Sequence, residues 1–180
     1  MIDRADLYAA VQQHMRKLFP AVGNLAGLCL YWSFCLLFEC HRRRLPMILQ
    51  AGDMCWPRVP VDQLDTWPAD EPTHVSFIWS PQTAASRQAV ARGALPEIHV
   101  WVAQPVALEI LDFSVGPTVR ALSTSLGLAW HGLPPPDYLW VGAADLPAGV
   151  VYRPNRAATE LALRHLTEHL IPTYLPRLRE

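Results

Sequence analysis

The chain has 180 residues, of which 51% are hydrophobic and 17% are charged, and its formal net charge at pH 7 is −1. This composition excludes an intrinsically disordered chain and is typical of a globular protein. A net charge near zero gives no electrostatic footprint for nucleic acid, so we expect no nucleic-acid partner. The length fits one domain with a sizeable core, which we place at residues 1–180.

A helix is predicted first, over residues 4–18, with Asp3 as its N-cap and Pro20 after its end. Its apolar residues recur at intervals of three and four, which places them on one face. A second helix is expected from Cys29 to about Arg43, and it is apolar nearly all round, which indicates a central buried helix. The single apolar face of the first helix is formed by Leu7, Val11, Met15 and Leu18.

Strands and loops follow, in a pattern that predicts an α+β domain. Residues 45–51 have the character of a strand, and Gly52-Asp53 has that of a turn. The proline-rich residues 52–73 are expected to form a long surface loop. The remaining elements are expected as a strand over 74–79, a short helix or flap over 81–95, strands over 97–103 and 107–113, a helix over 117–128, and strands over 137–141 and 149–152. A terminal helix is expected from about 155 to 170, with an irregular continuation past Pro172.

One apolar segment has to be weighed as a membrane anchor. Residues 18–38 carry no charge, and the basic run 41–44 follows them. Pro20, Gly23 and Gly27 interrupt the first half, and the remaining helix has the length of a buried core helix rather than of a span. We therefore expect no membrane association and a cytoplasmic protein.

Four cysteines occur, and none forms a C-x-x-C pair of the kind that binds zinc or works as a redox dithiol. Cys29 and Cys40 share nearly one helical face but would lie roughly 16 Å apart, which is too far for a disulfide. Reduced thiols are therefore expected. Cys35 and Cys40 are interpreted as core residues, whereas Cys55 is placed in an exposed loop without a partner.

The order Cys29, His99, Asp112 is that of a nucleophilic triad. A helix N-terminus presents unpaired N–H groups and a partial positive charge, which favour the thiolate of a cysteine placed there. An imidazole can take and return the proton near neutral pH, and a carboxylate fixes the tautomer of the imidazole. The pattern predicts Cys29 as nucleophile, His99 as general base and Asp112 as the orienting acid.

The motifs resemble those of the transglutaminase-like branch of the papain-fold enzymes. The matching pieces are the Gly27-Leu-Cys29 helix start, a strand that ends at Gly52, the His99-Val-Trp101 strand and the aspartate strand at Leu111–Ser114. The likeness covers roughly residues 23–116. It implies a papain-like core in which a helix carrying the nucleophilic cysteine packs on an antiparallel sheet.

Two positions depart from the pattern of that family without removing a catalytic group. Phe113 stands where the family often has proline, and Val100 stands where it usually has a small residue. Residues 53–96 carry no signature of the family, so the resemblance does not identify a substrate.

A tight turn at residues 104–106 would set residues 99 and 111 opposite each other in a hairpin. Asp112 would then approach His99 only with a one-residue adjustment such as a β-bulge, a device that often re-aims side chains beside active sites.

An oxyanion needs hydrogen-bond donors where its charge develops. The backbone N–H of Cys29 supplies one donor, and Asn24 is the side chain chosen for a second. Trp101 is expected to pack beside His99, and Trp32 to line the site. Alternatives for the side-chain donor are Gln12, Gln13 and Trp32.

Other histidines are interpreted without a catalytic role. His74 opens a strand, and His131 follows Trp130 in a loop. His165 and His169 lie one turn apart on the last helix, but no third ligand accompanies them, which favours a solvated face over a metal site.

These features predict a cysteine hydrolase that cleaves an amide, peptide or isopeptide bond through a thioester acyl-enzyme. The substrate would be a peptide, a protein or a small amide, and the chemistry needs no cofactor or metal. Two alternatives stay open. One is transglutaminase-type acyl transfer to an amine, and the other is a non-catalytic binding module on the same fold.

Overall fold

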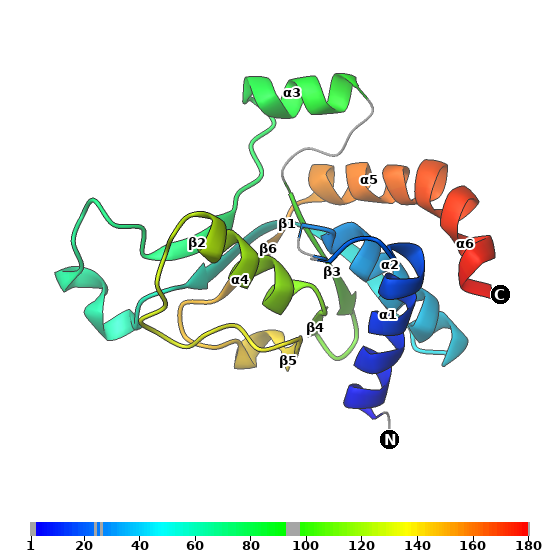
Figure 1. The fold of residues 1–180 in the computed structure, drawn as a ribbon, viewed down its shortest axis with the longest axis horizontal. Helices are drawn as coiled ribbons and strands as arrows, with labels where there is room; N and C mark the ends of the chain where they lie inside the picture. Colours follow the sequence, from blue (N-terminus) through cyan, green and yellow to red (C-terminus); the bar gives the residue numbers. More distant parts are fainter. Residues whose placement is uncertain (1–2, 24, 26, 93–97, 180) are drawn as a thin grey trace.

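The computed structural model of the chain describes residues 3–23, 25, 27–92 and 98–179. It has an α+β fold, in which helices pack on a curled antiparallel sheet (Figure 1). The predicted α+β class is therefore confirmed. In the described residues, no helix combines the length and the apolar character that a membrane span requires.

The two N-terminal helices form as their sequence patterns predict. α1 spans Arg4–Leu18, and the side chain of its N-cap Asp3 accepts hydrogen bonds from the backbone N–H groups of Ala5 and Asp6. α2 spans Cys29–Arg42, and most of its residues are buried, which confirms a central helix. The buried positions of α1 are those of the expected apolar face, Leu7, Val11, Met15 and Leu18.

The sheet has six strands, and every pair in it is antiparallel. The strands are β1 (Ile48–Pro57), β2 (His74–Phe77), β3 (His99–Gln104), β4 (Glu109–Asp112), β5 (Leu139–Gly142) and β6 (Val151–Pro154). Their order is β2-β1-β3-β4-β5, and β6 pairs with β1. β3 and β4, which carry the predicted histidine and aspartate, are therefore direct neighbours.

The first strand is longer than expected, and the predicted turn at Gly52-Asp53 is wrong. β1 passes straight through these residues to Pro57. A Cβ atom on Gly52 would lie 2.2 Å from the carbonyl oxygen of Arg153 in β6. Position 52 needs a glycine because the backbone of β6 passes too close for a side chain. Close approach of another backbone is a common reason for glycine inside a strand.

The β3–β4 hairpin has a different register from the one expected. Val102 pairs with Leu111 and Gln104 with Glu109, so four residues rather than three form the turn. Continuing this register sets Asp112 opposite Trp101 and diagonal to His99. Diagonal neighbours on one face lie within reach of long side chains, so no bulge is required.

The remaining elements agree with the predictions in type and differ at their ends. They are η1 (Val61–Thr66) inside the predicted surface loop, α3 (Ala84–Ala91), α4 (Val115–Ser125), η2 (Ala143–Asp145), α5 (Arg156–His165), the π-helix η3 (Leu166–Leu170) and α6 (Ile171–Arg179). The expected alternative of a short helix within 81–95 is realised as α3, which stands away from the sheet in Figure 1. The terminal helix continues past Pro172, as expected.

The sheet separates two apolar clusters. Residues of α1, α2 and α5 fill the cluster on one face, and residues of α4 fill the cluster on the other. Along β3 the side chains alternate, so that Val100 and Val102 belong to the first cluster and Trp101 to the second. By this alternation, the His99 side chain lies on the face of Trp101, whereas α2 packs on the opposite face of the sheet. The start of α2 lies beside the start of β3, which is where Cys29 and His99 come close together.

Candidate active site

The start of α2 is built as a sharp turn that leads into an uncapped helix. Gly27 adopts a left-handed conformation with φ of 73°, which glycine tolerates without strain. Its N–H donates to Oγ1 of Thr118 in α4 at 3.4 Å. The N-cap Leu28 makes no side-chain capping hydrogen bond. The N-cap side chain therefore leaves the first-turn N–H groups of α2 without a hydrogen bond, and these groups carry the partial positive charge of a helix N-terminus.

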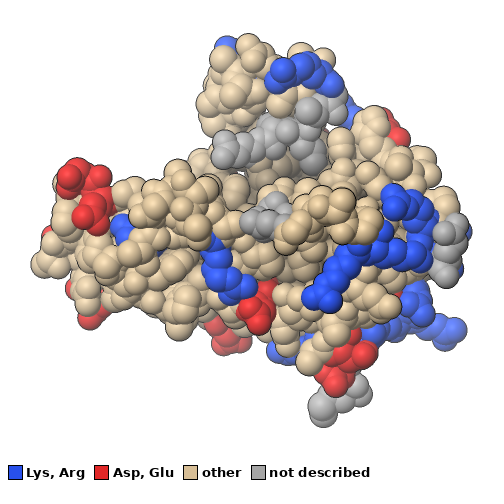
Figure 2. Space-filling model, viewed as in Figure 1, with Lys and Arg blue, Asp and Glu red and all other residues tan. Residues whose placement is uncertain are grey.

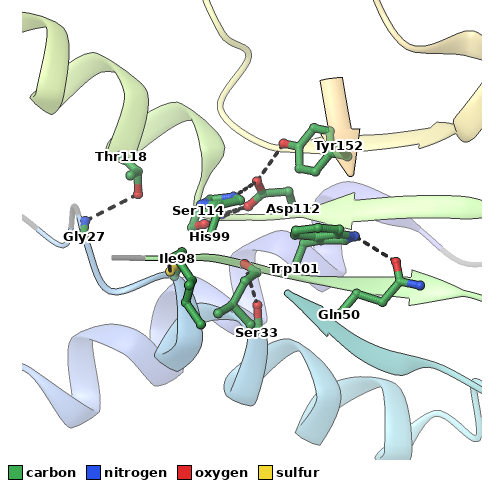
Figure 3. Close-up of polar contacts among 12 residues, drawn as sticks. Gly27, Ser33, Gln50, Ile98, His99, Trp101, Asp112, Ser114, Thr118 and Tyr152 are labelled. Atoms are coloured by element: carbon green, nitrogen blue, oxygen red, sulfur yellow. Dashed lines mark hydrogen bonds and ion pairs between the residues drawn. The ribbon is translucent and has the colours of Figure 1, made fainter. Parts of the chain in front are cut away.

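The first turns of α2 are fixed to β3. The hydroxyl of Ser33 donates to the carbonyl oxygen of Val100 at 3.2 Å. One turn earlier, the thiol of Cys29 points at the carbonyl oxygen of Ile98 at 3.7 Å. These two contacts hold Cys29 beside the first residue of β3, which is His99 (Figure 3).

His99 and Asp112 form a buried pair. Nε2 of His99 lies 2.6 Å from Oδ2 of Asp112, and both side chains are fully shielded from solvent. The pair lies across the β3–β4 ladder in the diagonal relation that the hairpin register creates. The structure thus brings together the three residues that the sequence order suggested.

The Asp112 carboxylate is fully occupied by donors (Figure 3). Its Oδ1 accepts from the backbone N–H of Ser114 at 2.9 Å and from the hydroxyl of the same residue at 2.7 Å. Its Oδ2 also accepts from the hydroxyl of Tyr152 in β6 at 2.7 Å. Burial opposes the charge of the carboxylate, but His99 and these hydrogen bonds prevail and lower the pKa of Asp112.

Two further residues at the site, Ser114 and Tyr152, are not indicated by the triad pattern of the sequence. Ser114 could have been found, because a serine two residues after an aspartate commonly bonds back to it. Tyr152 lies 40 residues from Asp112 and reaches it only because β6 pairs with β1. No local pattern signals that contact.

His99 is charged at neutral pH in this environment. Burial alone would lower the pKa of the ring, but the Asp112 carboxylate, with a smaller contribution from Cys29, raises it to about 10. Both ring nitrogens then carry a proton. Nε2 donates to Asp112, whereas the buried Nδ1 has no hydrogen-bond partner among the described residues.

Aromatic rings enclose His99. Phe77 of β2 stacks on it with ring centroids 5.4 Å apart, and Trp101 stacks at 6.2 Å. Tyr152 closes a third side at 6.0 Å. Trp101 is therefore beside His99 as expected, and its indole N–H donates to the side chain of Gln50 at 3.1 Å.

Trp32 lies under the turn that precedes Cys29. It is almost completely buried, and its indole N–H donates to the carbonyl oxygen of Leu25 at 3.2 Å. It lines a cavity of about 300 Å³ together with Gln12, one of the alternative donors. Asn24, the residue chosen as the oxyanion donor, lies outside the described residues.

The burial of two of the other cysteines agrees with their interpretation as core residues. All four cysteines are free, and Cys35 and Cys40 are buried. Cys55 was placed wrongly in a loop, since it lies half-buried within β1. Within the described ranges, no three side chains of the metal-ligating kinds come together to hold a metal ion.

Comparison with known proteins supports the fold alone. No protein-family model matches the chain. No curated protein matches it either. A solved structure described as "The crystal structure of genomics APC5867" is similar, with a TM-score of 0.56 and 14% sequence identity over 99% of this chain and 77% of that chain. A likeness at this identity indicates a shared fold and carries no information about activity.

Proposed function

We propose that the chain is a cysteine hydrolase that cleaves an amide, peptide or isopeptide bond. Cys29 is the nucleophile, His99 the general base and Asp112 the orienting acid, on a papain-like fold of the transglutaminase-like type. The proposal rests on the environment of one atom, Nδ1 of His99.

A buried N–H group without an acceptor is destabilising by about 1–3 kcal/mol. Nδ1 of His99 is such a group, and Cys29 is the neighbouring side chain whose charge acts on the ring. A thiolate on Cys29 would supply the acceptor that Nδ1 lacks and would be stabilised by the uncapped start of α2. A thiolate–imidazolium pair accounts for both features with groups already in place.

The chemistry follows from that pair. The thiolate attacks the carbonyl carbon, and the backbone N–H of Cys29 donates to the oxyanion of the tetrahedral intermediate. The C–N bond breaks as Nδ1 of His99 gives its proton to the leaving amine, which leaves a thioester on Cys29. Water then gives a proton back to Nδ1 and its hydroxide to the thioester carbonyl, which releases the acid and the free cysteine. Asp112 keeps the ring in place throughout.

Alkylation by iodoacetamide, mapped by mass spectrometry, tests the first element of this mechanism. We expect Cys29 to react nearly as fast at pH 6 as at pH 8. Cys55 serves as an internal control, because burial raises the pKa of its thiol. Cys29→Ala removes the fast phase and identifies its site.

Replacing His99 by Gln should make labelling of Cys29 at pH 6 at least tenfold slower. The matched control is His14→Gln, which removes the histidine of another histidine–carboxylate pair, 2.7 Å from Glu39. Equal labelling in the His99 variant and in the wild type would contradict the proposal. Fast labelling without turnover of any amide or thioester substrate would favour a binding module, and product formation that requires an added amine would favour acyl transfer.

A further inference from the structure

A second cavity lies far from Cys29 along α2. Its volume is about 740 Å³, and it lies between the C-terminal half of α2 and the helix formed by η3 and α6. Cavities of this size are typical of small-molecule sites, which are mostly apolar with a few placed polar groups. We call it the α2–α6 groove. Its lining residues are Phe34, Leu37, Phe38, His41, Arg42, Leu166, Ile171, Leu175, Leu178 and Arg179.

The π-helix shapes the floor of this groove. In an α-helix, residues five apart point about 140° away from each other. Here the N–H of Ile171 bonds to the carbonyl oxygen of Leu166, five residues earlier, so both side chains turn to the groove. Pro172 explains the widening, because it has no N–H for the carbonyl of Glu168 and its ring would clash with that carbonyl in a regular helix. Such widened turns occur frequently at functional sites.

The groove is elongated and apolar along its length. On α2 its lining runs from Phe34 to Arg42, a rise of roughly 12 Å. On α6 the apolar residues Ile171, Leu175 and Leu178 recur at intervals of four and three, so they form one continuous stripe. This shape suits an unbranched alkyl chain better than a compact ring system.

The two arginines that line the groove, Arg42 and Arg179, differ in their partners. Arg42 is neutralised by Glu39, with an N–O distance of 2.7 Å. Arg179 has no hydrogen-bond or ion-pair partner within the described part of the chain. Figure 2 shows Lys and Arg side chains gathered on the right-hand side, over the part of the molecule where α1, α2 and α6 lie. An apolar slot with a guanidinium at one end is complementary to an anion that carries an alkyl chain.

We propose that the α2–α6 groove binds a medium- or long-chain carboxylic acid, with the alkyl chain between α2 and α6 and the carboxylate on Arg179. The site is independent of the Cys29 chemistry. It requires no reaction, only burial of the alkyl chain and one charge-assisted contact.

Isothermal titration calorimetry with dodecanoate, below the concentration at which it forms micelles, tests this proposal on the full chain. One dodecanoate should bind per chain. Shortening the ligand to decanoate and octanoate should weaken binding about three- to fourfold for each CH₂ removed. The uncharged decanamide should bind at least about tenfold more weakly than decanoate, because it lacks the charge-assisted contact.

Two pairs of matched variants separate the groove from general charge and fold effects. Arg179→Gln should weaken decanoate about tenfold and leave decanamide unchanged, whereas Arg177→Gln, outside the groove lining on the same helix, should change neither by more than about twofold. Leu175→Trp should fill the groove and abolish binding of both. Leu163→Trp, at an exposed position of α5, should not. Circular dichroism melts confirm that each variant is folded.

Several results would overturn the proposal. They are the absence of dodecanoate binding, a stoichiometry of many ligands per chain, and equal effects of the two arginine variants. A dimer of the wild type that Leu175→Trp converts to monomers would assign the groove to a second copy of the chain instead.

Discussion

A histidine–carboxylate pair lies at each end of α2, and the two pairs have similar distances but different surroundings. At the start of the helix, Cys29 lies beside His99 and Asp112, whose N–O distance is 2.6 Å. Near its end, Glu39 lies 2.7 Å from His14 of α1. Distance alone therefore does not distinguish a candidate catalytic pair from a structural one.

Their surroundings do distinguish them. The Glu39 carboxylate is itself buried, but it is shared by His14, Arg42 and Arg43, whose side chains reach solvent to different extents. The His99–Asp112 pair is fully buried, and its carboxylate accepts hydrogen bonds from neutral hydroxyl groups. Nδ1 of the His99 ring has no hydrogen-bond partner among the described residues. A buried donor without an acceptor among the described residues requires an explanation, and the proposed mechanism supplies one in the Cys29 thiolate.

The largest difference should appear in stability when each carboxylate is removed. Asp112→Ala leaves a buried imidazole and two hydroxyl groups without their acceptor and takes away the charge that keeps the ring protonated, and we expect it to lower the free energy of unfolding by about 3–5 kcal/mol. Glu39→Ala leaves arginines that can turn to water, so its cost should be about 1–2 kcal/mol. Urea unfolding followed by circular dichroism measures both. Equal losses would mean that the His99–Asp112 pair carries no special burial cost.

The second contrast is in turnover. If the proposed mechanism holds, His99→Gln should lower the rate of hydrolysis of an activated thioester or ester by at least about 100-fold, the usual contribution of a general base. His14→Gln should leave the rate within about twofold. A rate insensitive to His99 would remove its assignment as base, and a loss in both variants would point to a fold effect, which the unfolding curves would reveal.

The pH dependence of stability separates the pairs in a third way. Because its pKa is raised to about 10, His99 contributes stability that is fully present below its unfolded value of about 6.5 and is lost as the pH rises toward 10. Glu39, whose pKa is lowered against the effect of burial by His14 and Arg42, contributes stability that is present above its unfolded value and is lost as the pH falls through its folded value. The pairs therefore respond to opposite ends of the pH scale.

The alkaline limb is measured in a Cys29→Ala background, as the difference between that protein with His99 and with His99→Gln, because a proton lost by Cys29 on folding would offset the proton that His99 gains. Between pH 6.5 and 8, the unfolding free energy of the protein with His99 should fall by up to about 1.4 kcal/mol per pH unit relative to the protein without it. Using the difference cancels the buried thiols Cys35 and Cys40, whose burial raises their pKa and which also favour unfolding at high pH. Parallel curves for the two proteins would mean that His99 is not held charged.

The sequence predicts elements well where the signal is local. The 3.6-residue period of α1, its N-cap Asp3 and the apolar run of α2 each lie within one element, and all are found as expected. The predicted register of the β3–β4 hairpin is wrong because a three-residue turn and a four-residue turn fit the same strand pattern. Gly52 was assigned to a turn because its real cause, the backbone of β6, comes from a hundred residues later in the chain.

The residues of the candidate site also differ in whether a local sequence pattern indicates them. Cys29, His99 and Asp112 could be proposed because each stands in a recognisable local pattern and their order matches a known arrangement. Ser114 is local to Asp112 and could have been added. Tyr152 belongs to a strand whose partner no pattern specified, so its contact with Asp112 is a consequence of topology alone.

Tyr152 provides the smallest and most selective prediction. Tyr152→Phe removes one of the donors to Asp112 without opening a cavity, so the free energy of unfolding should fall by about 1–2 kcal/mol. Because a donor to the carboxylate is lost, the pKa of Asp112 should rise and the acid limb of stability should shift to higher pH. Tyr8→Phe is the matched control, since its hydroxyl donates to a backbone carbonyl at 3.2 Å and Asp112 is not involved. Equal shifts of the acid limb in Tyr8→Phe and Tyr152→Phe would mean that the hydroxyl of Tyr152 does not stabilise the Asp112 carboxylate specifically. The hydroxyl donors would then no longer distinguish the His99–Asp112 pair from the His14–Glu39 pair.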